Sequence, residues 1–271
     1  MLVTAHTLAA IAGAPVNDNM VSTAIGLQMA GVGSGLEQPH RLAMFLGQLS
    51  HESMGWRYDR EIWGPTAAQQ RYEGRADLGN TQPGDGSRFR GRGPIQLTGR
   101  ANYTAFTAWA RGMDPKAPDF AANPDAVNSD PWEGLSPIWY WQTGNPTRQS
   151  LNKLADAGDY EALTRRINGG LNGYADRQKR YARAALVLMG RDPAGVREYQ
   201  AAVGLAADGI AGPRTIASMH KALASMPPVR FTESRIPVTD AVTTAPPGPD
   251  FTRFLIVIAV ALAAAIFILK G

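Results

Sequence analysis

The chain has 271 residues, 44% of them hydrophobic and 18% charged, with a formal net charge of +4 at pH 7. This length accommodates one good-sized domain and a small second one, at roughly 150 residues per domain. The absence of cysteine excludes disulfides and thiolate metal sites. A pI near 9.5 favours anionic partners such as wall polymers, phospholipid or nucleic acid, among which charge alone does not choose.

The first segment, residues 1 to about 190, has dense aromatic and helical patterning and is expected to be mainly α. Pro39 fits the first position of a helix. Leu42, Phe45, Leu46 and Leu49 follow at i, i+3, i+4 and i+7, the spacing of one buried helix face. The pattern therefore predicts an amphipathic helix that begins at Pro39.

Two more helices are predicted further along this segment. Asp130 and Pro131 fit the N-cap and first position of a helix that carries Trp139, Tyr140 and Trp141. Asp176 fits the N-cap of another, which ends near Gly190. Its apolar stripe consists of Tyr181, Ala184, Ala185 and Leu188. An irregular, glycine-rich stretch, about residues 74–99, lies between the first predicted helix and these two. A loop of this length inside a compact domain is usually functional or disordered.

The C-terminal part divides into three segments. Residues 191–226 have the pattern of a compact helical piece. Residues 227–250 are rich in Pro, Thr and Val, bury little apolar surface and are expected to form an extended linker. Residues 254–269, FLIVIAVALAAAIFIL, carry no charge and lie between Arg253 and Lys270. We expect a transmembrane helix over 251–270, since this apolar run would be about 24 Å long against a bilayer core of about 30 Å; a buried core helix is the alternative.

Charges around the apolar run predict its orientation. Arg230, Arg235 and Arg253 precede it, and only Lys270 follows. By the positive-inside tendency, the residues before the run should lie in the cytoplasm. The N-terminus, MLVTAHTLAAIAGAP, has no basic leader before its apolar stretch, so no signal peptide is expected.

Glu52 is the first candidate for chemistry. On a helical wheel it lies about 20° from Phe45, at the margin of the predicted apolar stripe. Partial desolvation there favours the protonated form of a carboxyl group, which suits a general acid. A solvated glutamate at a fraying helix end fits the position equally well.

Glu73 is the candidate for a second carboxylate. It lies outside any helical period, between Arg71 and Arg75, which would hold it ionised as a base requires. Two carboxylates kept apart in pKa are the working pair of most glycosidases. A surface glutamate paired with its arginine neighbours is the plainer interpretation, and Glu61 and Asp77 compete for the same role.

Two arginine patterns bear on partners. Arg177 lies one turn before Tyr181 on the apolar face, and an inward-facing arginine needs a carboxylate or a ligand. The run RFRGRG at 88–93 is similar to arginine–glycine segments that bind nucleic acid, but it is single, short and followed by apolar PIQL. No nucleic-acid partner is therefore expected.

Several sequence blocks together resemble glycoside hydrolase family 19, which contains plant and bacterial chitinases and many phage or prophage endolysins. The blocks are HES at 51–53, YEGRADLGN at 72–80, GDG at 84–86, FRGRGPIQLTGRANY at 89–103 and INGGLNGYADRQKRY at 167–181. They follow the family's order over about residues 40–190. The resemblance implies a catalytic domain over residues 1–190 that is mainly α and lysozyme-like, with two helical lobes and a central cleft.

The resemblance also implies a role for each matching residue. Glu52 would be the general acid, Glu73 the base that activates water, and Thr98 a hydroxyl that helps to position that water. The substrate-binding polar positions would be Gln96, Asn102, Asn168 and Arg177, the last associated with the base. The family inverts the anomeric carbon, which requires the two carboxyl groups to lie roughly 6.5–9.5 Å apart. No metal or other cofactor is implied.

Residues 196–215, VREYQAAVGLAADGIAGPRT, resemble the second half of a three-helix peptidoglycan-binding module, including its DGIxGPxT turn. The leading half is missing or merged with the preceding helix. The resemblance implies a partial wall-binding module over 191–226, and a structural helical hairpin without a ligand is the alternative.

Three functions follow from these observations. The first is an endolysin that hydrolyses β-1,4-glycosidic bonds of peptidoglycan during host cell lysis. It would be a monomer, tail-anchored in the inner membrane, with its catalytic domain cytoplasmic until lysis. The second is a chitinase with the same mechanism. The third is a membrane-tethered wall-binding protein without activity, disfavoured because Glu52, Glu73, Thr98 and Arg177 are all present.

Overall fold

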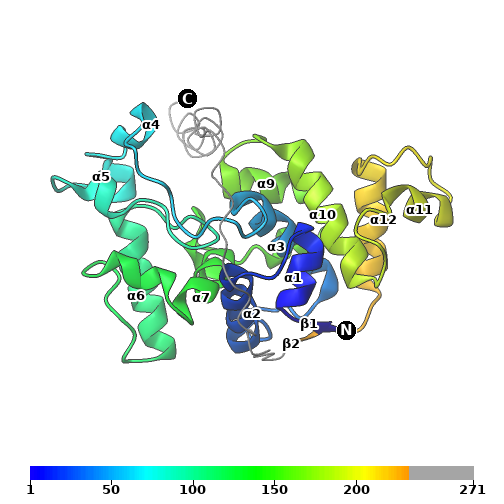
Figure 1. Cartoon of the computed structure of the whole chain (residues 1–271), viewed down its shortest axis with the longest axis horizontal. Helices are drawn as coiled ribbons and strands as arrows, with labels where there is room; N and C mark the ends of the chain where they lie inside the picture. Colours follow the sequence, from blue (N-terminus) through cyan, green and yellow to red (C-terminus); the bar gives the residue numbers. More distant parts are fainter. Residues whose placement is uncertain (232–271) are drawn as a thin grey trace.

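The computed structural model describes residues 1–231, which are mainly helical (Figure 1). The α-helices are α1 (Ala5–Ala12), α2 (Asp18–Ala30), α3 (Pro39–Glu52), α4 (Ala67–Gln70), α5 (Asp85–Arg88), α6 (Arg100–Met113), α7 (Trp132–Trp139), α8 (Asn152–Asp156), α9 (Tyr160–Asn168), α10 (Tyr174–Leu188), α11 (Val196–Ala202) and α12 (Pro213–Ala224). Short 3-10 segments cover η1 (Ala76–Leu78) and η2 (Pro124–Asn128), and a π-helical turn covers η3 (Tyr140–Gly144). Strand β1 (Leu2–Val3) pairs in parallel with β2 (Arg230–Phe231).

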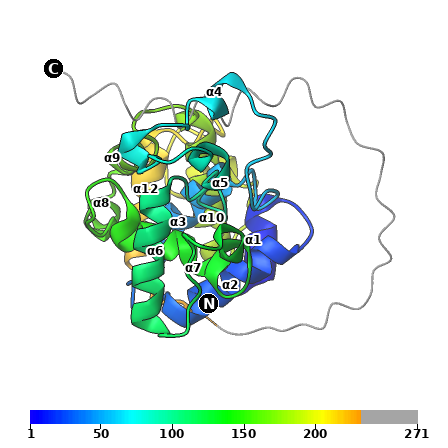
Figure 2. The ribbon, with the colours of Figure 1, turned by 90° about the vertical axis from the view of Figure 1, so that its left-hand side faces the viewer.

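Two groups of buried apolar side chains divide this part of the chain into two lobes. The larger core lies among α1, α2, α3, α10 and α12. The smaller core lies among α6, α7 and the loops before and between them. Helix α7 contributes to both, with Ile138 in the larger core and Leu135 in the smaller one. Figure 1 shows α4, α5 and α6 on one side and α9 to α12 on the other, and Figure 2 shows the molecule from the side of α4 to α6. The prediction of a mainly α chain is confirmed.

Helices α3 and α10 pack closely in the larger lobe. Gly47 permits this approach, because a Cβ at that position would lie 2.8 Å from the Cα of Tyr181 and 2.9 Å from the hydroxyl of Tyr160. The predicted stripe on α3 is entirely buried. The helix predicted to begin at Pro39 is confirmed, and it ends at Glu52.

The two later helices begin at other residues than predicted. Helix α7 starts at Trp132, with Pro131 in the N-cap position, so Asp130 is not its cap. Helix α10 starts after Gly173, whose φ of +68° is a left-handed conformation that glycine adopts without a steric penalty. Asp176 consequently lies inside the first turn of α10, where its carboxylate is available for contacts with α3.

Residues 191–231 pack on the large domain. Tyr199 of α11 and three apolar side chains of α12 are part of the larger core. Strand β2 lies beside β1, and the N–H of Val229 donates to the carbonyl oxygen of Glu37 at 2.8 Å. Residues 227–231, which were expected to open the linker, therefore belong to the folded body.

The remaining predictions for the C-terminal part concern a membrane-spanning helix and the rest of the linker. No helix within residues 1–231 is long and apolar enough to cross a membrane. The apolar run at 254–269 and the rest of the expected linker lie outside the described residues.

Candidate active site

Glu52 is the last residue of α3, and its carboxylate forms an ion pair with Arg177 of α10. Glu52 Oε1 lies 2.5 Å from Arg177 Nη2. The arginine side chain is fully buried, whereas that of Glu52 is 17% exposed. Arg177 also donates to Gln48 Oε1 and to the carbonyl oxygen of Asn172. A buried and fully engaged cation therefore holds a carboxylate that reaches the surface of the larger lobe.

This pairing corrects the implied role of Arg177. The family resemblance associated this arginine with Glu73, the expected base, whereas the structure places its guanidinium on Glu52, the expected acid. The sequence-based inference that an inward-facing arginine needs a carboxylate is confirmed. The sequence did not indicate which carboxylate would pair with Arg177, because Glu52 and Arg177 are 125 positions apart in the chain.

Other side chains of the last turns of α3 are also held by α10. Asp176 Oδ2 lies 2.7 Å from His51 Nδ1 and accepts a hydrogen bond from Arg180 Nε at 2.5 Å. Arg180 Nη1 donates to Ser50 Oγ at 3.0 Å. The hydrogen bond with His51, together with the Arg180 cation, holds the pKa of Asp176 well below its usual range. Helix α10 thus holds His51 and Ser50, the two residues before Glu52, by contacts that the HES motif alone did not predict.

Tyr140 lies beside this ion pair, in the π-helical turn η3. Its hydroxyl donates to the carbonyl oxygen of Ile167 at 3.3 Å. Burial, with the nearby charge of Glu52, raises the pKa of Tyr140 above its usual range. Asn168, a predicted substrate-binding residue, follows Ile167 as the last residue of α9 and is also buried. The ends of α3 and α9 and the start of α10 therefore meet around Tyr140, which the sequence indicated only as part of a helix.

Glu73 lies between α4 and η1 and has backbone partners. Its carboxylate accepts hydrogen bonds from the N–H of Gly84 at 2.6 Å and of Gly86 at 2.8 Å. A Cβ on Gly86 would lie 2.8 Å from Glu73 Oε2, so this approach requires glycine. Arg75, expected to hold Glu73 ionised, instead pairs with Asp77 at 2.5 Å. The GDG motif, rather than the flanking arginines, positions this exposed carboxylate.

Gln96, Thr98 and Asn102 form a chain of hydrogen bonds leading into α6. Thr98 Oγ1 donates to the carbonyl oxygen of Gln96, and Asn102 Nδ2 donates to that of Thr98, both at 2.8 Å. Gln96 has a φ of +56°, and such backbone strain in a non-glycine residue is commonly found at functional sites. The structure thus brings these three predicted residues together.

Glu61 and Asp77, the alternative candidates for the second carboxylate, both have hydrogen-bond or ion-pair partners. Glu61 is buried and accepts hydrogen bonds from Gln69 Nε2 at 3.0 Å and from the N–H of Gly91 at 3.2 Å. Asp77 pairs with Arg75 and is more than half exposed. Glu61 therefore joins α4 to the loop that contains Gly91, whereas Asp77 belongs to a surface ion pair.

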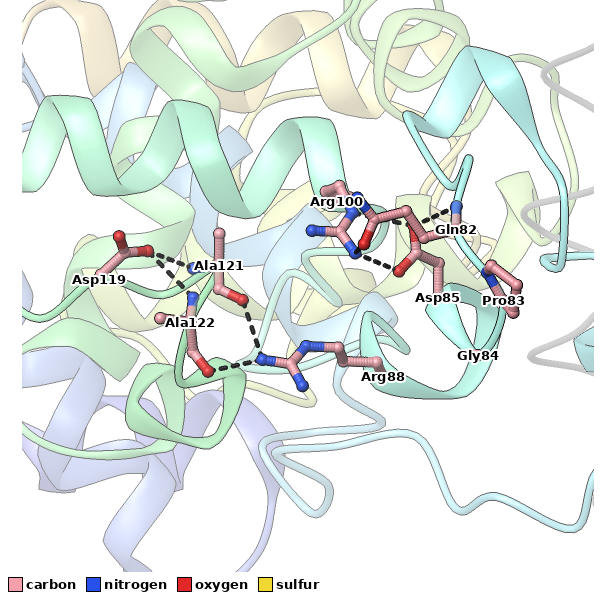
Figure 3. Close-up of a pocket in the computed structure, with 9 residues that line it drawn as sticks. All are labelled: Gln82, Pro83, Gly84, Asp85, Arg88, Arg100, Asp119, Ala121 and Ala122. Atoms are coloured by element: carbon pink, nitrogen blue, oxygen red, sulfur yellow. Dashed lines mark hydrogen bonds and ion pairs between the residues drawn. The ribbon is translucent and has the colours of Figure 1, made fainter.

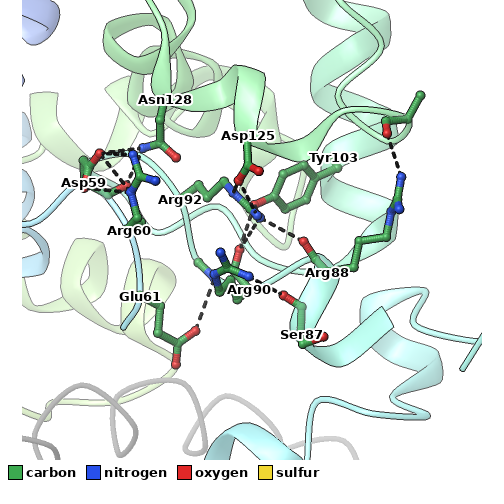
Figure 4. Close-up of polar contacts among 12 residues, drawn as sticks. Asp59, Arg60, Glu61, Ser87, Arg88, Arg90, Arg92, Tyr103, Asp125 and Asn128 are labelled. Atoms are coloured by element: carbon green, nitrogen blue, oxygen red, sulfur yellow. Dashed lines mark hydrogen bonds and ion pairs between the residues drawn. The ribbon is translucent and has the colours of Figure 1, made fainter. Parts of the chain in front are cut away.

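The arginine-rich run at 88–93 is largely structural. Arg92 is 3% exposed and donates to Asp125 Oδ1 and to the hydroxyl of Tyr103, each at 2.8 Å (Figure 4). Arg88 donates to the carbonyl oxygens of Ala121 and Ala122. These two arginines therefore connect residues 88–93 to residues 121–125 of the smaller lobe by hydrogen bonds.

A hollow of about 570 Å³ lies on the smaller lobe (Figure 3). Arg100 donates to the buried carboxylate of Asp85 at its wall and thereby lowers the pKa of Asp85. Gly84 both lines the hollow and donates to Glu73, so the hollow adjoins the candidate base. Its lining residues are Gln82, Pro83, Gly84, Asp85, Arg88, Arg100, Asp119, Ala121 and Ala122, and Glu52 is not among them.

Glu133, in the first turn of α7, is a buried carboxyl group that sequence analysis did not single out. It is 4% exposed, and its Oε1 has no hydrogen-bond partner. Burial, with the carboxylates of Asp59 and Asp130 nearby, raises the pKa of Glu133 to about 7. Despite this concentration of acids, no group of three or more His, Asp or Glu in the described part of the chain is arranged to hold a metal ion.

Glu133→Gln is expected to stabilise the protein at high pH only. The folded form keeps the Glu133 proton up to about pH 7, whereas the unfolded chain releases it near 4.5, so stability is lost as pH rises between these values. Glutamine cannot ionise, and the variant should gain about 1–3 kcal/mol relative to the parent at pH 8. Urea unfolding at pH 4 and pH 8 measures this gain, and a gain that did not depend on pH would contradict it.

A mainly α domain with two cores, an ion-paired glutamate at a helix end and a second, exposed glutamate has the architecture and the pair of carboxyl groups expected of a lysozyme-like glycoside hydrolase. The sequence matches the profile of the chitinase class I family, glycoside hydrolase family 19, over residues 17–180. The chain therefore belongs to glycoside hydrolase family 19.

Individual relatives agree with this assignment. A glycosyl hydrolase family 19 domain-containing protein of Haemophilus influenzae is 34% identical over 172 residues, which cover 54% of this chain and 78% of that protein. The acidic 27 kDa endochitinase of Solanum lycopersicum is 34% identical over 145 residues, 48% of this chain and 53% of the plant protein. Among solved structures, a bacterial family 19 chitinase is similar with a TM-score of 0.53 and 25% identity, covering 70% of this chain and 96% of that chain. The chain spans about half the length of the plant chitinase.

Proposed function

We propose that this glycoside hydrolase cleaves the β-1,4-glycosidic bonds of bacterial peptidoglycan and acts as an endolysin in host cell lysis. The observation that carries the proposal is the net charge of +4, with a pI near 9.5. Peptidoglycan bears acidic peptide stems, whereas chitin is uncharged, so a basic enzyme is attracted to the first polymer and not to the second. The resemblance of residues 196–215 to a wall-binding module supports the same substrate.

Catalysis in this proposal is inverting and uses two carboxyl groups. Glu52 donates its proton to the glycosidic oxygen, and Arg177, at 2.5 Å, stabilises the carboxylate that remains. Glu73 accepts a proton from the water that attacks the opposite face of the sugar. The backbone donors of Gly84 and Gly86 hold the Glu73 carboxylate in position for this step.

Polar side chains complete the proposed site. Thr98 helps to position the attacking water through its hydroxyl oxygen, whose proton is donated to the carbonyl of Gln96. Gln96, Asn102 and Asn168 contact the hydroxyl and acetamido groups of the sugar. Peptidoglycan strands are the proposed partner, bound by a monomer without a cofactor.

Chitin hydrolysis by the same residues is the second candidate function. It is favoured by the plant relatives, such as the tomato protein, which are described as endochitinases. Both polymers have β-1,4-linked N-acetylglucosamine units, so the reacting bond is similar. The polymers differ in the acidic peptide stems, which peptidoglycan carries and chitin does not.

Zymography with purified peptidoglycan beside colloidal chitin separates these functions. Clearing of peptidoglycan supports the endolysin, and clearing of chitin alone would overturn it. If a correctly folded sample cleared neither polymer but sedimented with purified walls, the protein would be a wall-binding protein without activity. Mass spectrometry of the products then identifies the bond: reducing-end muramic acid indicates a muramidase, and reducing-end glucosamine indicates a glucosaminidase.

We also propose that the apolar run at 254–269 anchors the enzyme in the inner membrane, with the catalytic domain in the cytoplasm until lysis. The support comes from the sequence, in which Arg230, Arg235 and Arg253 precede the run and Lys270 follows it. Deletion of residues 251–271 should release the protein from membranes and leave its activity on isolated walls unchanged. Protease digestion of the catalytic domain from outside intact spheroplasts would show the opposite orientation.

A further inference from the structure

Arg166, in the last turn of α9, is an arginine whose charge has no acidic partner among residues 1–231. No carboxylate lies within 4.0 Å of its guanidinium, although the side chain is partly buried. Its neighbour Arg165 is different, because it pairs with Glu161 at 2.9 Å on the exposed face of the same helix. An unpaired, partly buried cation loses solvation without compensation, which suggests a ligand of opposite charge.

The guanidinium of Arg166 is held in one orientation by a loop. Arg166 Nη1 donates to Thr147 Oγ1 at 2.6 Å, and Thr147 Oγ1 donates to Asn145 Oδ1 at 2.8 Å. Asn145 is 2% exposed and donates to the carbonyl oxygens of Tyr140 and Gln149. This relay engages one nitrogen of Arg166 and fixes the side chain while Nε and Nη2 remain available to donate.

The relay places Arg166 at the edge of the Glu52 site. The charges of Glu52, Arg177 and Arg166 all act on Tyr140, so the three groups lie near one partly buried ring. Tyr140 also donates to the carbonyl oxygen of Ile167, the residue after Arg166. Hydrogen bonds through Thr147 and Asn145 thus connect Arg166 to Tyr140, the residue that lies beside the Glu52–Arg177 ion pair.

We propose that Arg166 binds a carboxylate of the substrate's acidic peptide stem and thereby gives the enzyme its preference for peptidoglycan over uncharged glycans. The proposal rests on the proposed function and identifies the residue that discriminates between the two polymers. A guanidinium with two available donors is suited to a carboxylate, and chitin offers only neutral hydroxyl and acetamido groups.

The experiment compares Arg166→Gln, Arg166→Lys and the matched control Arg165→Gln on three substrates. These are soluble peptidoglycan fragments, the same fragments with their carboxyl groups converted to methylamides, and soluble chitin oligosaccharides. Kinetic constants are measured at low ionic strength, because salt screens a partly exposed ion pair. Melting temperatures of all variants show whether the overall fold is intact.

Arg166→Gln should lower kcat/KM on native peptidoglycan by about tenfold, mainly through KM, as expected for loss of one charge-assisted hydrogen bond. It should leave rates on the methylamide fragments and on any chitin substrate cleaved by the parent unchanged. Arg166→Lys should recover part of the loss, and Arg165→Gln should behave as the parent protein. An equal loss on charged and neutralised peptidoglycan, or no loss on either, would overturn the role of Arg166. Failure of the parent protein to cleave native peptidoglycan would overturn the proposed function itself, and the role of Arg166 with it.

Discussion

Glu52→Gln is expected to lower the rate of glycan hydrolysis by about 10²–10⁴-fold and to leave substrate binding intact. The substitution removes the transferable proton and preserves the shape of the side chain. The glutamine oxygen can still accept from Arg177 Nη2, so the buried guanidinium keeps a partner. The measurement is kcat on peptidoglycan fragments, beside a binding assay and a circular dichroism melt.

Glu161→Gln is the matched control for this substitution. Glu161 is 52% exposed and pairs with Arg165 one turn along α9, and a surface pair of this kind contributes about 1 kcal/mol or less. Its loss should change neither fold nor rate. Should the Glu52 variant retain more than about a tenth of the parent activity, Glu52 is not the general acid.

Glu73→Gln is expected to have a similarly large effect, a loss of about 10²–10⁴-fold in kcat, because an inverting reaction depends on a base to activate water. The fold should be unaffected, since Glu73 is exposed and glutamine still offers one oxygen to Gly84 or Gly86. Thr98→Ala should be less damaging, because a hydroxyl that positions water contributes less than the base. Single-turnover rates and melting temperatures of both variants test this order.

Glu61→Gln and Asp77→Asn are the comparisons that decide which carboxylate is the base. Glu61→Gln should lower the melting temperature, because Glu61 is buried and joins Gln69 to Gly91. Asp77→Asn should change little, because it removes only a surface ion pair with Arg75. If either variant lost more activity than Glu73→Gln while remaining folded, the assignment of Glu73 would be wrong.

Local patterns in the sequence determined the helical class and the position of α3. The residues Leu42, Phe45, Leu46 and Leu49 recur with the helical period, and burying such a stripe requires a helix that begins near Pro39. The motif blocks between His51 and Tyr181 determined the family. Both conclusions depend on residues that are neighbours in the chain or occur in a fixed order, and a single sequence contains that information.

Helix ends were less predictable, because several residues near each end have suitable chemistry. Asp176 has the side chain of an N-cap, but Gly173 three positions earlier adopts the left-handed conformation from which α10 begins. The Asp176 carboxylate then pairs with His51 and Arg180. Asp176 could have capped a helix locally or paired with a residue far away in the chain. The packing of α10 on α3 brought His51 within reach of its carboxylate.

Only the tertiary structure decided which charged groups meet. The sequence required a partner for Arg177 and offered several carboxylates, and the packing of α3 on α10 selected Glu52, 125 residues away. It likewise gave Glu73 the N–H groups of the GDG motif in place of the flanking arginines, and left Arg166 without an acid in the described residues. An apolar stripe specifies that a face is buried and not what it is buried against, because hydrophobic burial is non-directional. Ion pairs and hydrogen bonds depend on separations of a few ångströms, which arise only when distant segments have packed.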